Sequence, residues 1–529
     1  MKHIANTTRT VAVFLLLATS ICGQAYCQGS QIFLRNLGGA LLFHLPRNVP
    51  TVQTPTIRTS HISLATQQRT PQIASKVVTP PQVDTWTHPH AFVPLVQGPY
   101  KQDLDRMLRQ QDLDRMLRRY LSYVQIPSQS TYPDDPATEW PMNEGQKKIA
   151  QHIYQEIKSL GGNVEVTLSP DYYVYAKVPA NTRKRCPSVC FMAHMDVTPE
   201  VAADGLLIPQ VIKDYQGGDI PLGTSGLMLS PDSATGAHLK DVIGHILVTS
   251  RGRTNTGADD KTGCAILVSM IEQILQDKSP HGDVYVMLTQ NEDVGMAAYR
   301  VDLQLLGGTP DIFIDVDGGE PWQYSTSNFS AVGRTYKFVG NLRHPAFGGT
   351  NGYVDAHTAL AYFIGQIPPE FNPMHSAGDQ GYLQAYIIDD LGDGSYRVKF
   401  RIRYFAKEDS ATYANCLNEA HRKTLDAFPG LRIVLEANYL QYENVAYSMS
   451  THTIPVIERA AARTGLTMSP EVIRAGTTGA MMVARGLPGA SCIYSAQNSE
   501  HTVYEWCSIN ELLQIRNLCV NIVKEVAKL

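Results

Sequence analysis

The chain has 529 residues, of which 43% are hydrophobic, so it can bury a large core and is long enough for two or three domains. Its formal net charge is -4, and 18% of its residues are charged. These values exclude a disordered polyelectrolyte. They also give no electrostatic reason to expect a nucleic-acid partner.

The amino end has the pattern of a secretory signal peptide. Basic residues precede an apolar run over 11–18, and small and polar residues continue to Ala25. The run is too short to span a bilayer. We therefore predict a signal peptide over residues 1–25, a secreted or periplasmic protein, and no stable membrane insertion after cleavage. A lipid anchor is less favoured, because bulky residues precede Cys22 and Cys27.

Two unusual segments follow. Residues 26–100 are rich in Thr, Gln, Pro and Ser without a sustained hydrophobic period, which predicts a low-complexity linker.

A direct repeat follows the linker, QDLDRMLRQ at 102–110 and QDLDRMLRR at 111–119. Nine residues are about two and a half helical turns, so the two copies cannot present the same face to one core. Because apolar residues at helical spacing begin at Leu113, we predict that only the second copy packs.

Expected helices and strands alternate beyond the repeat. The pattern predicts helices near 144–160 and from about 260, and strands near 172–178, 188–193, 284–289 and 311–315. Such alternation predicts an α/β fold. Residues 328–440 have their own helices, near 353–367 and 410–428, and alternating strands, near 396–403 and 432–438. They are predicted to form an inserted domain between two parts of a catalytic domain, 101–327 and 441–529.

Acidic and histidine side chains follow several of these strands, where open α/β sheets place their ligands. The stretch NTGADDKTG sets two carboxylates side by side at a turn. A helix start explains such a pair, and so does a divalent metal, which removes the repulsion between them. The other clusters favour the metal: His194 and Asp196 follow one strand, Glu292 and Asp293 a second and Asp317 a third, and His501 lies in a late loop.

The order of these motifs carries a family resemblance. The stretches are RRYLSYVQIPSQS, YQGGDIPLG, GADDKTG, VDGG and HTVYE. From about Asp112 to its end, the chain resembles the peptidase T branch of the M20 metallopeptidase family. The resemblance implies an α/β zinc-peptidase catalytic domain, with a mixed sheet flanked by helices, and an inserted smaller α+β lid domain. It also implies two Zn²⁺ ions and removal of the N-terminal residue from tripeptides or other short peptides.

The resemblance also implies a role for each site residue. It makes Asp259 the ligand that bridges two zinc ions, with a cis peptide bond to Asp260. Glu292 matches the general base, which deprotonates a metal-bound water and returns the proton to the leaving amine. The remaining matches are His194 and Asp317 as ligands of the first zinc, Asp293 and His501 as ligands of the second, Asp196 as the carboxylate that orients His194, and Glu505 as the acid that follows His501.

The lid contributes three expected substrate-binding residues. The stretch GNLRHPAFGG matches the family's lid motif, so His344 is expected to stabilise the tetrahedral oxyanion, with Asn341 nearby. Arg403 in RIRYF is expected to bind the peptide's carboxylate. The chain departs from the pattern at Asp293, where the family has Glu, and at Thr478, where it has an acid. These departures bear on the expected preference for tripeptides, whereas the residues expected to carry out catalysis are all present.

Two other classes of function stay open. One is a different M20-type hydrolase, such as a dipeptidase or an amino-acid deacylase. The other is an exported peptide-binding protein without turnover, which the presence of Glu292 argues against, because binding alone needs no general base. A homodimer through the lid is a further expectation.

Overall fold

The computed structural model describes side chains for residues 108–529, except 133–139, 202–208, 342–343, 345 and 347–351. Before residue 108 it describes only the backbone of 25–28, 31–36, 39–44 and 99–107. The chain divides into two compact units, Met1–Val93 and Pro94–Leu529. The predicted signal peptide lies outside the described residues, apart from Ala25, and so does most of the predicted linker.

The first unit contains three short strands within the segment that we predicted as a linker. They are β1 (Ala25–Gln28), β2 (Gln31–Asn36) and β3 (Gly39–His44), which pair antiparallel in that order. The linker prediction is therefore corrected over these residues. The stretches QIFLRN and GALLFH contain residues that favour strands.

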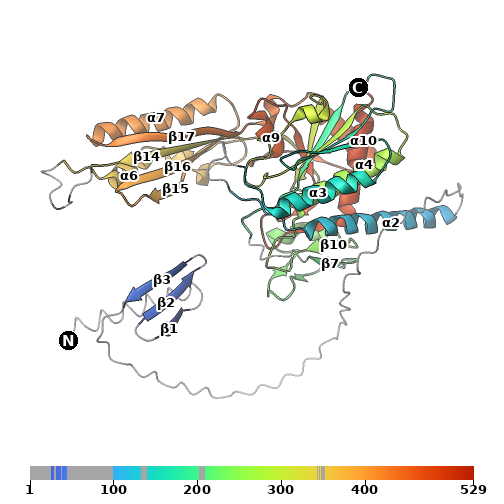
Figure 1. Ribbon diagram of the computed structural model, residues 1–529, viewed down its shortest axis with the longest axis horizontal. Helices are drawn as coiled ribbons and strands as arrows, with labels where there is room; N and C mark the ends of the chain where they lie inside the picture. Colours follow the sequence, from blue (N-terminus) through green and yellow to red (C-terminus); the bar gives the residue numbers. More distant parts are fainter. Residues whose placement is uncertain are drawn as a thin grey trace, which may run out of the picture. The chain divides into compact units, whose positions relative to one another are not determined.

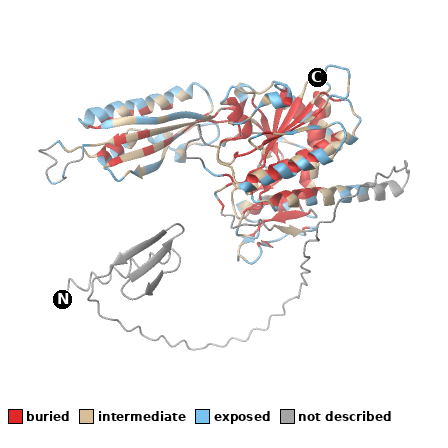
Figure 2. Ribbon diagram, in the orientation of Figure 1, coloured by how far each residue is buried: buried red, intermediate tan, exposed pale blue. Residues whose placement is uncertain are grey.

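The second unit is built on an eight-stranded mixed sheet, ordered β18-β13-β19-β12-β6-β11-β5-β4. In its centre β11, β6 and β12 run parallel, whereas β5 and β4 at one edge run antiparallel. Every residue of β6 and β11 is buried, as expected for strands covered on both faces (Figure 2). The strands are β4 (Glu165–Leu168), β5 (Val174–Val178), β6 (Val189–His194), β11 (Val284–Thr289), β12 (Ile312–Gly318), β13 (Gln323–Asn328), β18 (Ser469–Ile473) and β19 (Ser491–Tyr494).

Helices flank this sheet (Figure 1). The helix α3 begins with a capping box, in which Asn143 and Gln146 exchange side-chain and backbone hydrogen bonds. The helix α4 is buried along most of its length, and α10 packs against α4 and α8. The helices are α3 (Glu144–Ser159), α4 (Ala258–Gln276), α8 (Thr453–Thr464), α9 (Thr478–Val483) and α10 (Ile509–Val526).

Two smaller sheets and several short 3-10 helices complete this part of the unit. A four-stranded sheet has the order β20-β21-β10-β7, and β8 pairs with β9. Their strands are β7 (Gln210–Ile212), β8 (Ile220–Pro221), β9 (Met228–Leu229), β10 (Leu247–Thr249), β20 (Gln497–Asn498) and β21 (Trp506–Ser508). The short helices of this part are η1 (Ala234–Asp241), η2 (Leu303–Leu306) and η6 (Val445–Tyr447), whereas η4 (Pro369–Phe371) and η5 (Pro373–His375) belong to residues 330–442.

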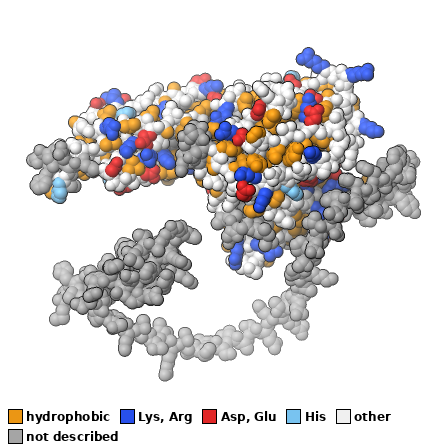
Figure 3. Space-filling view, viewed as in Figure 1, with side chains coloured by type: hydrophobic (Ala, Val, Ile, Leu, Met, Phe, Trp, Pro, Cys, Tyr) orange, Lys and Arg blue, Asp and Glu red, His pale blue; other side chains and the backbone are white. Residues whose placement is uncertain are grey.

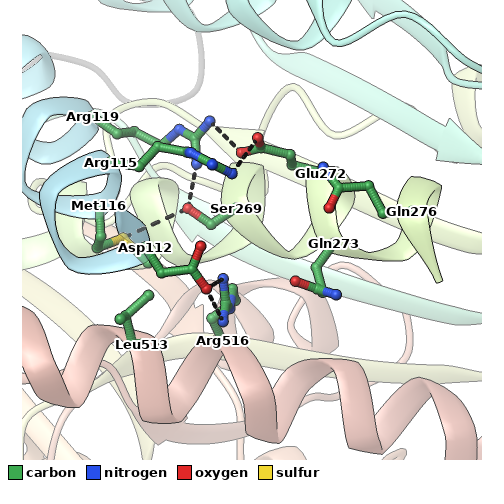
Figure 4. Close-up of a pocket in the computed structure, with 10 residues that line it drawn as sticks. All are labelled: Asp112, Arg115, Met116, Arg119, Ser269, Glu272, Gln273, Gln276, Leu513 and Arg516. Atoms are coloured by element: carbon green, nitrogen blue, oxygen red, sulfur yellow. Dashed lines mark hydrogen bonds and ion pairs between the residues drawn. The ribbon is translucent and has the colours of Figure 1, made fainter. Parts of the chain in front are cut away.

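The direct repeat forms a single helix, α2 (Pro99–Val124). The end of the first copy is exposed, with Leu108 49% accessible, whereas Met116, Tyr120 and Val124 are buried. The prediction that the second copy packs is confirmed. Charged side chains of this copy also dock on α4 and α10 (Figure 4), because Arg119 and Arg115 pair with Glu272, and Asp112 pairs with Arg516. Arg119 also pairs with Glu156 of α3.

Residues 330–442 form a separate α+β layer, the lid. Its antiparallel sheet has the order β15-β16-β14-β17. The helices α6 and α7 cover one face and share a core with side chains such as Phe338, Phe363 and Phe400 (Figure 1). Basic and acidic side chains are intermingled on the lid surface seen in Figure 3. The elements are β14 (Ser330–Val339), α6 (Ala356–Gly365), β15 (Tyr382–Asp390), β16 (Ser395–Tyr404), α7 (Asp409–Ala427) and β17 (Arg432–Tyr442).

None of the helices in the described part of the chain is both long and apolar enough to cross a membrane.

Candidate active site

The sheet brings the predicted ligands to one edge. His194 is the last residue of β6, Asp317 lies near the end of β12, and Asp293 follows β11 in a turn. These three strands are parallel neighbours, so their carboxyl ends lie together. Asp259 comes from the start of α4, and His501 from the loop between β20 and β21.

Two groups of side chains meet at this edge and share Asp259. In the first, Nε2 of His194 lies 2.8 Å from Oδ1 of Asp259 and 3.6 Å from Oδ1 of Asp317. In the second, Nε2 of His501 lies 2.8 Å from Oδ1 of Asp293 and 3.1 Å from Oδ2 of Asp259. The two oxygens of one carboxylate therefore face two different imidazoles.

The donor set fits a pair of divalent cations. Each group offers one imidazole nitrogen and carboxylate oxygens within 4.8 Å of one another, which are ligands that zinc and similar metals accept. Oδ2 of Asp293 is buried without a hydrogen-bond partner. Burial and the charge of Asp259 raise the pKa of Asp293 to about 7. A bound cation would offset both the burial and the repulsion that cause this shift.

The adjacent aspartates have different contacts. Their peptide bond is cis, as the resemblance implied. Asp259 faces the histidines, whereas Asp260 turns inward and accepts hydrogen bonds from the backbone N–H groups of His194, at 3.2 Å, and Gly263, at 3.0 Å. Asp260 thus ties the end of β6 to the start of α4. Glu505 supports the same turn by accepting from the N–H of Asp259 at 3.1 Å.

Asp196 lies behind His194. Its Oδ1 is 3.5 Å from Nδ1 of His194, the ring nitrogen that faces away from Asp259, and its Oδ2 accepts from the N–H of Asp293 at 3.3 Å. Asp196 is fully buried. It therefore contacts one residue of each metal-ligand group.

Glu292 lies in the turn that also carries Asp293. The preceding Asn291 has a positive φ of 59°, an uncommon conformation that asparagine tolerates. Its side chain accepts from Gln146 at 2.6 Å and donates to the carbonyl of Pro141 at 2.9 Å, which fastens the turn to α3 and its approach. Burial and nearby carboxylates, Asp317 first among them, raise the pKa of Glu292 well above its usual value despite the opposing charge of His194.

His501 has a third carboxylate neighbour that the sequence analysis missed. Oε2 of Glu200 lies 3.2 Å from Nδ1 of His501, and Oγ1 of Thr198 lies 3.4 Å from the same nitrogen. Glu200 follows His194 by six positions in the stretch HMDVTPE. The sequence offered one signal, an acidic residue soon after His194 at the end of a strand. Only the folded loop shows that Glu200 faces His501.

The lid residues have their own surroundings. Asn341 is exposed at the end of β14 and donates to the carbonyl of Gly352 at 3.0 Å. His344 is exposed in a loop that is only partly described. Arg403 on β16 is 8% exposed, and its guanidinium lies 5.3 Å from the ring centre of Tyr442. Among the described contacts, none joins Asn341 or Arg403 to the metal-ligand residues.

The stretch RAGTTG forms the connection into α9. Arg474 donates to the carbonyls of Gly378 and Gln380, so it joins this connection to a loop of the lid. Thr478 is 1% exposed and its hydroxyl has no hydrogen-bond partner. The next N–H, of Gly479, donates to Asp315 at 3.2 Å.

Comparisons with known proteins agree with this geometry. No protein-family model matches the chain. Peptidase T of Clostridium perfringens is 29% identical over 415 residues, which cover 78% of this chain and 98% of that protein. Among solved structures, the aminopeptidase PepT of Bacillus cereus superposes with a TM-score of 0.60 at 18% identity, covering 78% of this chain and 99% of the other.

A dinuclear metal-binding peptidase of the M20 family from Bacillus subtilis superposes with a TM-score of 0.54 at 11% identity, over 79% of this chain and 99% of the other. Fold and site together define an α/β peptidase with a candidate two-metal centre. The chain is similar in sequence to peptidase T and shares its fold with peptidase T and with a peptidase of the M20 family. The predicted fold class is likewise confirmed.

Proposed function

We propose that this protein is an exported dizinc aminopeptidase that removes the N-terminal residue from tripeptides or other short peptides. The observation that carries the proposal is the position of Asp259, whose two carboxylate oxygens face His194 and His501 at 2.8 and 3.1 Å. A single carboxylate between two imidazoles is the arrangement that a metal-bridging ligand requires.

The two metal-ligand groups divide the remaining residues between them. His194 and Asp317 complete the first site with Asp259, and Asp293 and His501 complete the second. When bound, two zinc ions would polarise the scissile carbonyl and lower the pKa of a shared water. Asp196 holds the ring of His194 in place through Nδ1, as carboxylates behind metal-binding histidines do.

Glu292 is the proposed general base. Its carboxylate takes a proton from the attacking water and returns it to the leaving amine. Three features support this role: Glu292 is 9% exposed, it directly precedes Asp293, and a hydrogen-bonded turn holds its backbone in place. It belongs to neither of the two groups that share Asp259, so its carboxylate stays available to move a proton.

The lid supplies the proposed substrate contacts. His344 would donate to the oxyanion of the tetrahedral intermediate, with Asn341 nearby. Arg403 would bind the peptide's carboxylate. These assignments rest on the family resemblance and on the position of Arg403 at the base of β16, opposite Ala331 and Tyr382.

The test uses the full chain without its first 25 residues. Chelator-treated protein should lose hydrolysis of a free tripeptide and recover it with zinc or cobalt, and an amino-blocked tripeptide should resist cleavage. Equal activity with and without chelator would contradict the proposal. Cleavage of dipeptides or acylated amino acids, but not of tripeptides, would identify the alternative M20-type dipeptidase or deacylase. Metal binding without any hydrolysis would identify the peptide-binding alternative.

Two further properties belong to the same proposal. Export follows from the signal-peptide pattern, and an amino-terminal sequence of the mature protein that begins near residue 26 would support it. A homodimer through the lid would use an edge strand such as β17, on which Leu435 is 47% and Leu440 38% exposed. Light scattering of the full chain and of a chain lacking residues 330–442 would test the dimer.

A further inference from the structure

Two arginines lie two positions apart on the lid strand β16, and their surroundings differ. The core of the lid contains Val398, Phe400 and Ile402, so the alternate residues Arg401 and Arg403 lie on the face away from α6 and α7. Arg403 is buried and donates to the carbonyl of its own neighbour Ile402 at 3.0 Å. Arg401 is exposed.

Aromatic rings surround Arg401. Its guanidinium carbon lies 4.1 Å from the ring centre of Tyr386, close enough for a cation-π contact that orients the guanidinium plane. On the next strand, Gly333 pairs with both Arg401 and Tyr439. The ring of Tyr439 packs directly over Gly333, because a Cβ atom added at Gly333 would lie only 2.5 Å from this ring. The ring therefore lies beside Arg401, on the other strand that pairs with Gly333.

Arg401 has no acidic partner in the described part of the chain. Its neighbour on the same face, Arg397, forms an ion pair with Glu436 at 2.6 Å, whereas the recorded side-chain contact of Arg401 is with Tyr386. A guanidinium without a carboxylate partner has hydrogen-bond donors available for one. Arg401, Tyr386 and Tyr439 are called the Arg401 subsite below.

This subsite borders the active site. At the base of the lid, the side chain of Gln441 on β17 lies close to Gly295, which follows Asp293 by two residues. If Gly295 carried a Cβ atom, that atom would be 3.0 Å from the side-chain nitrogen of Gln441. The exposed Tyr132 is influenced by charges of both regions. Burial and the charges of Glu200 and Asp293 raise its pKa, and the positive charges of His501 and Arg401 oppose that rise. The strand β17, which carries Tyr439, therefore contacts the turn that follows Asp293.

We propose that the Arg401 subsite binds a carboxylate of the peptide substrate and makes the enzyme prefer acidic peptides. The carboxylate is either the C-terminal one or that of an aspartate or glutamate side chain, since a guanidinium binds both in the same bidentate manner. This inference rests on the proposed function, and it assigns a second arginine of the lid, beside Arg403, to carboxylate binding.

The experiment compares the parent with Arg401→Gln. Lys399→Gln is the matched control, because it removes the same charge from the same face two positions further from the base of the lid. Four substrates separate the two sources of the carboxylate: Ala-Ala-Ala as free acid and as amide, and Ala-Ala-Glu amide and Ala-Ala-Gln amide. For each protein, kcat/KM is measured and compared within each pair.

In the parent and in Lys399→Gln, we expect the carboxylate member of at least one pair to be favoured by about tenfold or more, which is the scale of one charge-assisted hydrogen bond. In Arg401→Gln, that ratio should fall to within about twofold of one. A preference for the free acid over the amide identifies the C-terminal source, and a preference for Glu over Gln identifies the side chain. Equal ratios in the parent and in Arg401→Gln would overturn the inference.

Calorimetric binding of the same peptides separates this inference from the proposed function. If the parent cleaves none of the four peptides, the proposed function fails, and the binding ratios still decide the role of Arg401. If cleavage occurs but neither ratio depends on Arg401, the proposed function stands and the subsite is wrong. Unchanged thermal unfolding of Arg401→Gln serves as the folding control.

Discussion

The carboxylate of Glu200 lies 3.2 Å from Nδ1 of His501, on the ring nitrogen opposite the one that faces Asp259 and Asp293. Asp196 has the same relation to His194. Each histidine of the candidate metal centre thus has a carboxylate behind it, which selects the tautomer that leaves Nε2 free to bind metal.

Glu200→Gln should weaken metal binding at the second site. Loss of such a carboxylate lowers metal affinity by about 10- to 100-fold. We expect a loss of about 10-fold here, because the Glu200 side chain is 56% exposed and water weakens its interaction with His501. Titration with a metal-buffering chelator, followed by metal analysis, measures the change. Glu144→Gln, which alters an exposed glutamate on α3, is the control. Equal retention of both metal equivalents in Glu200→Gln and the parent would show that Glu200 has no such role.

Glu292→Gln should keep both metals and lower turnover by about 100-fold or more, because it removes the proposed base without removing a ligand. His501→Ala should instead lower occupancy of the second site. Metal content and kcat are measured on the same preparations. A Glu292→Gln protein that turns over like the parent would mean that another group is the base.

His238 should stabilise the fold more at low pH than at high pH. Burial lowers the pKa of His238, but the hydrogen bond and charge of Glu511, together with Asp241, outweigh it and raise the pKa above its usual value. A raised pKa means stabilisation that is complete below the unfolded value of about 6.5 and lost as pH rises through the folded value.

The test is His238→Gln, which leaves the buried carboxylate of Glu511 without its charged partner. The midpoint of thermal unfolding should fall by about 2–4 °C at pH 6 and by less at pH 9. His375→Gln, on an exposed residue of the lid, controls for the loss of a histidine. An equal fall at both pH values would contradict the prediction.

Removing residues 1–108 should leave a soluble and active enzyme. The ion pairs of Asp112, Arg115 and Arg119 with α10, α4 and α3 all lie beyond this cut. Removing residues 1–121 deletes them, along with the buried Tyr120, and should destabilise the protein strongly.

The two truncations are compared with the mature chain for rate on one tripeptide and for thermal unfolding. A large loss of rate in the shorter truncation, with unchanged unfolding, would show that residues before 109 contribute to the site.

Local sequence pattern was sufficient to place most of the secondary structure and the candidate metal ligands. His194, Asp293 and Asp317 lie at or just after buried strands, and such strands are apolar runs that a sequence displays directly. The same reasoning identified which copy of the repeat packs, because helical spacing brings Met116 and Tyr120 onto one face. It missed β1, β2 and β3, because a short strand in a polar segment has little periodicity to detect.

Only the tertiary structure decided how these residues face one another. Asp259 and Asp260 are chemically identical neighbours, yet one faces two histidines and the other holds the backbone of His194. Arg401 and Arg403 lie on one strand face, but neighbouring strands bury one guanidinium and leave the other exposed. Such differences arise from contacts between residues hundreds of positions apart, as between Glu200 and His501. A sequence determines which groups are available, and packing determines which of them meet.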